Sequence, residues 1–190
     1  MAKVRLKNSP NIRFVEGDLL TVGPDELGGP FDVVFSVGVL HHTPDPDGGF
    51  RNLVRLVRPG GRVIVWVYSS EGNALVRWLV EPTRKIFLRW LPRPIVFGLA
   101  WAISIPLLAT MHTVYRLPLP FLPFYEYLAR HRRLTVRKTV GDVFDKLNAP
   151  HTDFIARARI ERWLATDGLT DVHLSPHLGV SWRASATRRA

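Results

Sequence analysis

The stretch Phe31-Asp32-Val33-Val34-Phe35-Ser36-Val37-Gly38-Val39-Leu40-His41-His42 decides how this 190-residue chain folds. Its first six residues form an apolar, β-branched run with turn residues on both sides, which is typical of a strand buried on both faces of a parallel sheet. Residues 48–57 repeat apolar side chains at helical spacing, and the following Arg58-Pro59-Gly60-Gly61 ends that helix. A second buried strand is predicted over residues 62–68. Strand, helix and strand in this order indicate a βαβ unit.

Upstream of this unit, residues 11–15 have the pattern of a short strand that ends at Glu16-Gly17-Asp18. The order of elements over residues 1–70 therefore predicts an α/β fold with a parallel sheet. Ligands of open α/β sheets bind beyond the carboxyl ends of the strands. Three polar loops are expected there, formed by residues 16–18, 36–47 and 68–73.

The quoted stretch resembles the fourth conserved segment of class I S-adenosylmethionine-dependent methyltransferases, of the type 11-like group. Gly17-Asp18-Leu19 is similar to the acidic segment of their third strand, and residues 56–63 are similar to the approach to their fifth strand. The order and spacing of all three segments also match. The resemblance implies a Rossmann-like class I methyltransferase sheet and a methyltransferase enzyme, with S-adenosylmethionine as the cofactor.

Four cofactor contacts follow from this resemblance, residue by residue. Asp18 would accept a hydrogen bond from the adenine amino group, and the backbone N–H of Leu19 would serve a ring nitrogen. Ser36 and Val37 would touch the methionine portion of the cofactor. The alternative for Asp18 is that its carboxylate only tightens a loop.

The resemblance places His41 and His42 at the border of the transfer site, with His41 also beside the cofactor. Methyl transfer depends mostly on alignment and exclusion of water, so the two histidines are candidates and no catalytic residue is assigned. Alternatively, both side chains only line the start of a helix. Adjacent histidines do not converge on one ion, and the chain has no cysteine, so no metal site is expected.

One departure from the family pattern concerns cofactor binding. The glycine-rich loop after the first strand and the acidic residue after the second strand have no counterpart in this sequence. The matched pattern starts just before the third strand of the family. We therefore expect the C-terminal part of a methyltransferase sheet, with its first two strands absent, and a fragment with impaired cofactor binding.

Basic residues concentrate in the middle of the chain. The net charge is +10, and residues 71–140 carry eleven basic and three acidic side chains. Within them, residues 94–115 have no formally charged side chain, and Pro106 lies in the middle of this run. We expect a helical insertion after the fifth-strand equivalent, acting as a lid or as an interfacial or re-entrant helical pair on an anionic membrane, rather than a single span. The alternative is a packed cap with solvated arginines. The long apolar run argues against a nucleic acid partner.

Residues 141–190 complete the same domain. Residues 142–151 are polar and rich in turn formers, residues 155–168 have the pattern of a helix, and strands beginning near residues 172 and 180 predict a closing hairpin. Asp145, His151 and Trp182 are candidates for the mouth of the substrate site. In the alternative interpretation, Trp182 belongs to the core and the two polar residues cap turns.

Two hypotheses about function follow. The first is methyl transfer from S-adenosylmethionine to a small-molecule or lipid-like acceptor, with the insertion as a lid that excludes water. The alternative is a non-catalytic remnant that binds a membrane surface or a protein partner through residues 71–140. No apolar leader pattern opens the chain, so a cytoplasmic protein with peripheral membrane contact is expected.

Overall fold

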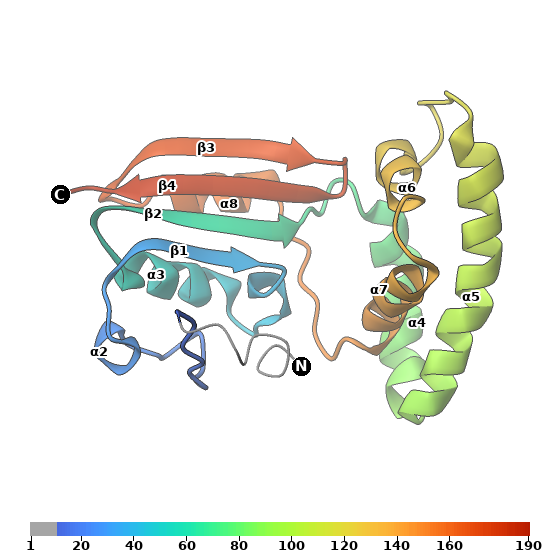
Figure 1. Ribbon diagram of the computed structural model, residues 1–190, viewed down its shortest axis with the longest axis horizontal. Coiled ribbons are helices and arrows are strands. Elements are labelled where there is room, and N and C mark those ends of the chain that lie inside the picture. The colour runs from blue at the N-terminus through green and yellow to red at the C-terminus, as the bar shows by residue number, and fades with distance from the viewer. Residues whose placement is uncertain (1–10) are drawn as a thin grey trace.

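The structure, a computed structural model, describes residues 11–190 as a sheet part and a helical part that lie side by side (Figure 1). The sheet has the strand order β1-β2-β4-β3. β1 and β2 run parallel, whereas β4 is antiparallel to both β2 and β3. This mixed sheet with a closing hairpin confirms the predicted fold class. The strands are β1 (Phe31–Val37), β2 (Val57–Tyr68), β3 (Leu169–His177) and β4 (Ser181–Arg188).

The helix α3 (Pro46–Leu56) is the crossover between the parallel strands β1 and β2. It follows the short 3-10 helix η1 (Leu40–His42). The carboxylate of Asp45 accepts a hydrogen bond of 2.9 Å from the backbone N–H of Gly48, which caps the first turn of α3. Pro46 occupies the first helical position, where its missing N–H costs nothing. The predicted helix is thus confirmed, one residue shorter at its C-terminal end.

β2 begins earlier than the sequence predicts. Phe31 pairs with Val57 and Val33 pairs with Arg62, so residues 58–61 form an irregularity between two pairs of the ladder. Only glycine fits at position 61, because a Cβ atom there would lie 2.7 Å from the carbonyl oxygen of Asp32. The proline-glycine segment therefore does not separate the helix from the strand as a loop. It is a distorted start of the strand itself.

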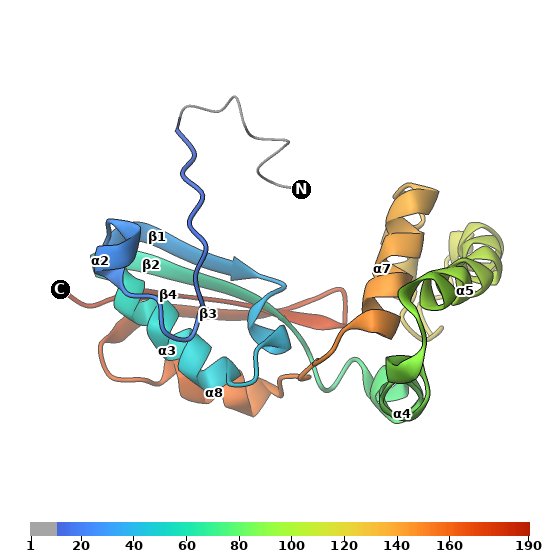
Figure 2. The ribbon, with the colours of Figure 1, turned by 90° about the horizontal axis from the view of Figure 1, so that it is seen from below.

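Two helices cover the same face of the sheet, α3 and α8 (Arg157–Leu164) (Figure 2). The rings of Phe50 from α3 and Trp163 from α8 stack with their centroids 5.1 Å apart. The apolar side chains of β2 and β4 that point to this face complete the core. The buried core residues are Leu40, Phe50, Leu53, Val57, Val63, Val65, Val67, Ile155, Ile160, Trp163, Leu164, Leu169, Trp182, Ala184 and Ala186.

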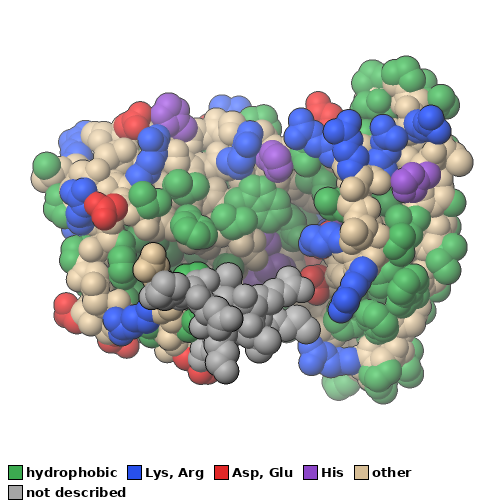
Figure 3. Space-filling view, in the orientation of Figure 1, with side chains coloured by type: hydrophobic (Ala, Val, Ile, Leu, Met, Phe, Trp, Pro, Cys, Tyr) green, Lys and Arg blue, Asp and Glu red, His purple; other side chains and the backbone are tan. Residues whose placement is uncertain are grey.

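The opposite face of the sheet is apolar and exposed, as the hydrophobic side chains in the centre of the sheet part show (Figure 3). Val33, Phe35 and Val37 of β1 are 51%, 70% and 60% exposed. Among residues 11–190, β1 pairs with β2 only, so its other edge has no strand neighbour. The prediction of a strand over residues 11–15 is wrong, because a strand needs a hydrogen-bonded neighbour and none of the described residues supplies one.

The helical part lies at the ends of β1 and β2 and is built from short and long helices. The expectation of a polar, turn-rich segment over residues 142–151 is wrong, because α7 continues to Asn148. Thr135 caps α7 by accepting from the N–H of Lys138, and Val140 and Leu147 pack on α5. The helical part therefore extends eight residues beyond position 140. Its elements are η2 (Val76–Val80), α4 (Glu81–Ile86), η3 (Leu88–Trp90), α5 (Arg93–Thr113), η4 (Val114–Arg116), α6 (Tyr125–His131) and α7 (Val136–Asn148).

α5 is one continuous helix and not the helical pair that we expected around Pro106. The hydroxyl of Thr110 donates to the carbonyl oxygen of Pro106 at 2.8 Å and supports the backbone there. Length and composition would allow the helical segment from Arg93 to Arg116 to cross a membrane, and only 22% of its most apolar window is buried. One such helix is weak evidence of a span.

A cluster of charged side chains, partly open to solvent, joins the N-terminal turn of α3 to α8. The guanidinium of Arg159 donates to both carboxylate oxygens of Asp47, at 3.0 Å and 2.8 Å, and the indole N–H of Trp163 donates to the same carboxylate. The hydrogen bond with Arg159 is the largest cause that lowers the pKa of Asp47 below its usual range. A carboxyl whose pKa is lower in the folded chain stabilises the fold above its unfolded pKa, and this contribution is lost as the pH falls through the folded pKa.

We expect Asp47→Asn to reduce the free energy of unfolding by about 1–2 kcal/mol at pH 7, because it weakens charge-assisted hydrogen bonds that are partly open to solvent. Urea denaturation of the two chains measures this difference. The difference should shrink as the pH falls from about 4, near the unfolded pKa, through the lower folded pKa at which the wild-type carboxylate takes up its proton. Asp167→Asn, at an exposed carboxylate outside the cluster, is the matched control. Equal stability of Asp47→Asn and wild type at pH 7 would contradict the role of the cluster.

Candidate functional site

The chain leaves and re-enters the sheet part at one place, the end of β2. The backbone N–H of Ile155 donates to the carbonyl of Tyr68 at 2.9 Å, and the N–H of Ser70 donates to the carbonyl of Ile155 at 3.1 Å. The amide of Asn73 donates to the carbonyls of Ser69 and Val180, at 2.8 Å and 2.7 Å. These bonds fix the helical part against the carboxyl ends of β1 and β2, where ligands of α/β sheets bind. Residues 150–155, which bring the chain back to the sheet, are called the return segment below.

His41 of η1 lies at the centre of this junction. Its side chain is fully buried, and neither ring nitrogen has a hydrogen-bond partner among the described residues. The ring centroids of Tyr68 and His42 lie 4.2 Å and 4.3 Å away. Burial lowers the pKa of His41 to about 3, and the positive charges of His42 and Lys146 act in the same direction. His41 is therefore neutral at physiological pH and has an unused lone pair.

The ring of His42 is oriented by the return segment. Its Nδ1 lies 2.8 Å from the carbonyl oxygen of His151. A carbonyl oxygen only accepts, so Nδ1 carries a proton and donates it to this bond. The backbone N–H of Asp153 also donates to the carbonyl of His41 at 2.7 Å. Residues far apart in sequence thus hold the pair of histidines in place.

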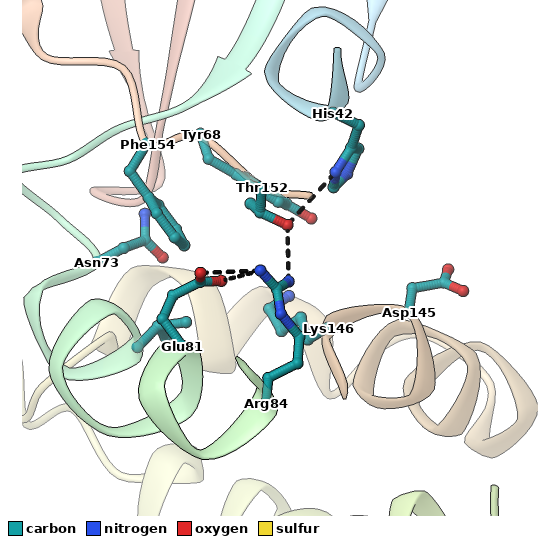
Figure 4. Close-up of a pocket in the computed structure, with 10 residues that line it drawn as sticks. His42, Tyr68, Asn73, Glu81, Arg84, Asp145, Lys146, Thr152 and Phe154 are labelled. Atoms are coloured by element: carbon teal, nitrogen blue, oxygen red, sulfur yellow. Dashed lines mark hydrogen bonds and ion pairs between the residues drawn. The ribbon is translucent and has the colours of Figure 1, made fainter. Parts of the chain in front are cut away.

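A small cavity lies between His42, α4, α7 and the return segment (Figure 4). Arg84 is buried here; its guanidinium donates to the Glu81 carboxylate at 2.8 Å and to the hydroxyl of Thr152 at 2.9 Å. The volume of this small cavity, about 30 Å³, suits water molecules and not a methyl acceptor. The ion pair therefore joins the helical part to the return segment rather than forming a substrate pocket.

A larger cavity of about 420 Å³ lies beside the small one. This volume falls within the range of small-molecule sites. Tyr68 and Lys146 line both cavities, so the large cavity adjoins the histidine pair. Most of its wall is apolar, and α5, α6 and α7 supply half of the lining residues. The residues that line it are Trp66, Tyr68, Asn73, Val76, Leu107, Phe124, Tyr127, Leu128, His131, Leu134, Lys138, Asp142, Lys146 and Val180.

The ammonium of Lys146 lies over two aromatic rings. Its Nζ is 5.5 Å from the ring centroid of Tyr68 and 5.8 Å from that of Tyr127. Burial lowers the pKa of Lys146, and the nearby carboxylates of Asp142 and Asp145 offset this only in part. Burial and the charge of Asp142 also raise the pKa values of both tyrosines. The two tyrosines are therefore neutral hydrogen-bond donors at physiological pH.

Asp142 is the acidic side chain of the large cavity. Its carboxylate contacts the ammonium of Lys138 and lies 3.5 Å from Nε2 of His131. The ring of His131 in turn stacks on Tyr127, with centroids 5.1 Å apart. Burial lowers the pKa of His131, and Asp142 opposes that shift. These contacts hold the polar side chains of the cavity wall in place.

The cofactor candidates from the sequence lie in different environments. Ser36 ends β1 with a buried hydroxyl that has no partner among the described residues, whereas Val37 is exposed. Asp18 is exposed, and one of its carboxylate oxygens accepts from the backbone N–H of Leu20 at 2.9 Å. Leu19 packs against the core, and its carbonyl accepts from the amide of Asn52. The structure thus brings Ser36 to the carboxyl end of β1 and places Asp18 in a turn beside α3.

The three substrate candidates are not brought together. Asp145 lines the small cavity, and His151 contributes its backbone carbonyl to His42. Trp182 lies in the core, where its indole N–H donates to Glu71 at 3.3 Å, and it lines neither of the two cavities.

Sequence reasoning missed Tyr68, Tyr127 and Lys146 as site residues. Tyr68 had a usable signal, because it opens one of the three loops expected at the carboxyl ends of the strands. Tyr127 and Lys146 had none, since they lie on helices that only the tertiary structure brings to the end of β2.

Comparison with known proteins agrees with the resemblance drawn from the sequence. The family model described as a methyltransferase domain matches residues 1–65. A ubiquinone biosynthesis O-methyltransferase of Caulobacter sp. (strain K31) is 37% identical over 67 residues, which are 35% of this chain and 26% of that protein. A trans-aconitate 2-methyltransferase of Deinococcus radiodurans is 34% identical over 85 residues, or 45% of this chain and 31% of that protein. The chain thus matches about a third or less of the length of these relatives.

The fold is also similar to that of a solved structure. An O-methyltransferase family protein from Burkholderia thailandensis superposes with a TM-score of 0.50 at 15% identity, covering 99% of this chain and 39% of that one. At this identity the likeness concerns the fold alone. The sequence match covers the βαβ unit, and the fold match covers the sheet with its closing hairpin. Residues 1–65 thus match a methyltransferase family, and the fold of the chain is similar to that of an O-methyltransferase family protein.

Proposed function

We propose that this chain forms the acceptor side of a methyl-transfer site and that the acceptor is a small, largely apolar molecule with an oxygen nucleophile. The large cavity at the end of β2 is the observation that carries the proposal, because it combines an apolar wall with one polar end. The oxygen is inferred from the names of the similar proteins, two of which are described as O-methyltransferases. An apolar body would lie against Leu107, Leu128 and Leu134.

The residues at the end of β1 fit a polar cofactor. The hydroxyl of Ser36 and the ring of His41 are buried and unpartnered among the described residues, which is costly unless a ligand supplies the missing hydrogen bonds. When bound, S-adenosylmethionine supplies an electrophilic methyl group on a sulfonium sulfur. Ser36 and His41 would hold the cofactor near the methyl group, and the side chains of the cavity would exclude water.

Lys146 is placed to take the proton of the acceptor. Its lowered pKa leaves a larger share of neutral amine than an exposed lysine has, and its position beside Tyr68 links the acceptor cavity to the histidine pair. The hydroxyl proton of the acceptor would pass to Nζ while its oxygen bonds to the methyl carbon, and the bond from that carbon to the sulfonium sulfur would break, so that the sulfur leaves with the electron pair as a neutral thioether. The phenol of Tyr68 donates a hydrogen bond that orients the acceptor.

The first test concerns the acceptor cavity. Purified chain, millimolar S-[methyl-³H]adenosylmethionine and a panel of hydroxylated quinones, phenols and fatty acids should yield labelled product that partitions into organic solvent. Leu128→Trp would fill the cavity and should lower kcat/KM at least tenfold, because the acceptor loses its apolar contacts. Leu134→Met, which conserves volume and polarity, is the control. Labelling of polar acceptors alone, or equal rates for Leu128→Trp and wild type, would contradict the proposed acceptor class.

The second test concerns Lys146. If its neutral amine accepts the proton, the rate should rise with pH through the lowered pKa of Lys146 and level off above it. Lys146→Met should remove this rise and lower kcat by about a hundredfold, a common size for general-base catalysis. Lys138→Met, which removes an ammonium from the same cavity wall, should keep the rise with pH. A pH profile unchanged by Lys146→Met would show that Lys146 does not accept the proton.

The third test concerns the cofactor. We expect the 190-residue chain by itself to bind S-adenosylmethionine only weakly, because its sequence has no counterpart of the glycine-rich loop and its Asp18 is exposed. Isothermal titration calorimetry of this chain measures the affinity. A micromolar dissociation constant would show that the residues from Asp18 to His41 suffice for binding.

A further inference from the structure

The outer surface of the first helices of the helical part is unusually rich in exposed aromatic side chains. Trp78, Phe87 and Trp90 are 78%, 64% and 71% exposed, and Leu79 and Ile86 beside them are 64% and 60% exposed. They lie on η2, α4 and η3, which follow one another along the chain. Large contiguous apolar patches are rare on soluble monomers and mark interaction sites. These five side chains are called the apolar patch.

The apolar surface continues onto α5, which forms the outer edge of the molecule (Figure 1). α5 buries only the stripe of Val96, Ala100, Ser104 and Met111, which faces α7 and α6. Its other faces are apolar as well, and Ile95 and Ile105 are 50% and 62% exposed. Packing within the chain therefore uses mainly one side of this helix and leaves side chains such as Ile95 and Ile105 largely exposed.

Three basic side chains flank the apolar patch. Lys85, Arg89 and Arg93 line a cavity of about 380 Å³ together with Leu88, Leu91 and the C-terminal end of α7. Arg84, the fourth basic residue there, is already bound to Glu81 and Thr152. Lys85 is 3.7 Å from Glu81 with 70% of its side chain exposed, and no ion pair occupies Arg89 or Arg93 among the described residues. No acidic side chain lines this cavity.

We propose that the apolar patch and its basic cavity dock the protein on an anionic lipid bilayer. Tryptophan and phenylalanine side chains would insert at the level of the headgroups, and Lys85, Arg89 and Arg93 would bind lipid phosphates. The guanidinium of Arg89 already lies 4.3 Å over the ring of Trp90, so the cation and the inserted ring belong to one surface. The lining of the basic cavity has no acidic side chain, and this charge complementarity with lipid phosphates favours an anionic bilayer as the partner.

The helix α5 lies on the bilayer and does not cross it. Val96 and Ala100 pack against Val140 and Leu147 of α7, and a crossing helix would have to give up this core. The helical part is also fixed to the sheet through Ile155 and Asn73, which keeps both ends of the insertion on one side. This docking does not depend on methyl transfer.

Flotation of the purified 190-residue chain with vesicles tests the proposal. Vesicles of phosphatidylcholine with 30–40% phosphatidylglycerol, a range of the order found in anionic membranes, should carry the protein upward at low salt, and pure phosphatidylcholine vesicles should carry little. High salt should release it, because screening shortens the reach of the three cations. Recovery that is equal with both vesicle types, or absent with both, would overturn the proposal. Retention after an alkaline carbonate wash would overturn it in favour of a span.

Variants identify the surface. The triple change Lys85→Gln, Arg89→Gln and Arg93→Gln should lower partitioning to anionic vesicles by about a hundredfold, given the usual effect of one basic residue near such a surface. Its matched control removes three exposed arginines of the sheet part, as Arg55→Gln, Arg162→Gln and Arg189→Gln, and should lose far less. Equal losses in both triple variants would show that only net charge acts, which would overturn the assignment of this surface.

The apolar patch has its own variant pair. Trp78→Ser with Trp90→Ser should weaken binding at least tenfold, whereas Phe35→Ser with Val172→Ser removes exposed apolar side chains of the sheet and should not. All four are exposed, so circular dichroism should show the wild-type fold in both pairs. In the double tryptophan variant, binding equal to wild type would overturn the insertion of the patch. On the wild type, a blue shift of tryptophan emission with anionic vesicles gives an independent reading of insertion, and its absence would count against it.

Discussion

The pairing of the return segment with the end of β2 is the constraint on which the rest of the structure depends. Ile155 closes the core of the sheet part with a fully buried side chain while its backbone bonds to Tyr68 and Ser70. The same few residues therefore bury apolar surface, satisfy backbone groups and set where the helical part begins and ends. Without these bonds, no wall would face the carboxyl ends of β1 and β2, and the histidine pair would be open to water.

Neutral imidazole and phenol side chains lie beside the ion pairs in the space that this pairing creates. His41 is neutral because it is buried, and the pKa shifts of Tyr68 and Tyr127 keep their phenols protonated. A site with neutral donors and acceptors near a mostly apolar cavity favours an acceptor that is itself uncharged until it loses a proton. Exclusion of water from this cavity would align the acceptor and also determine which group holds its hydroxyl proton. Methyl transfer depends more on these two effects than on a strong acid or base.

The elements that were predicted correctly owe their structure to local patterns. The strand at Phe31, the capped helix after Asp45 and the C-terminal hairpin each carry their signal in one continuous stretch of twenty residues or fewer. Failures came where distant residues decide. Residues 11–15 have strand composition but no strand neighbour among residues 11–190, and α7 looks polar because only its contact with α5 shows which side chains are buried. The site divides in the same way: His41 and His42 belong to a motif, whereas Lys146 becomes a site residue only through the tertiary fold.

The close approach of Gly72 to the hairpin has a consequence for how such a chain can change over evolutionary time. A Cβ atom on Gly72 would lie 1.6 Å from the carbonyl oxygen of Gly179. Only glycine therefore fits where the loop after β2 contacts the tip of the β3–β4 hairpin. The chain leaves the sheet after Tyr68 and rejoins it at Ile155, and these two residues are hydrogen-bonded to each other. The residues between them therefore form an insertion that is attached to the sheet at one place. The cost of closing such an excursion grows only slowly with its length. Segments of other lengths and compositions could therefore replace this one while the strands keep their register, and the choice of acceptor could diverge independently of the parallel sheet.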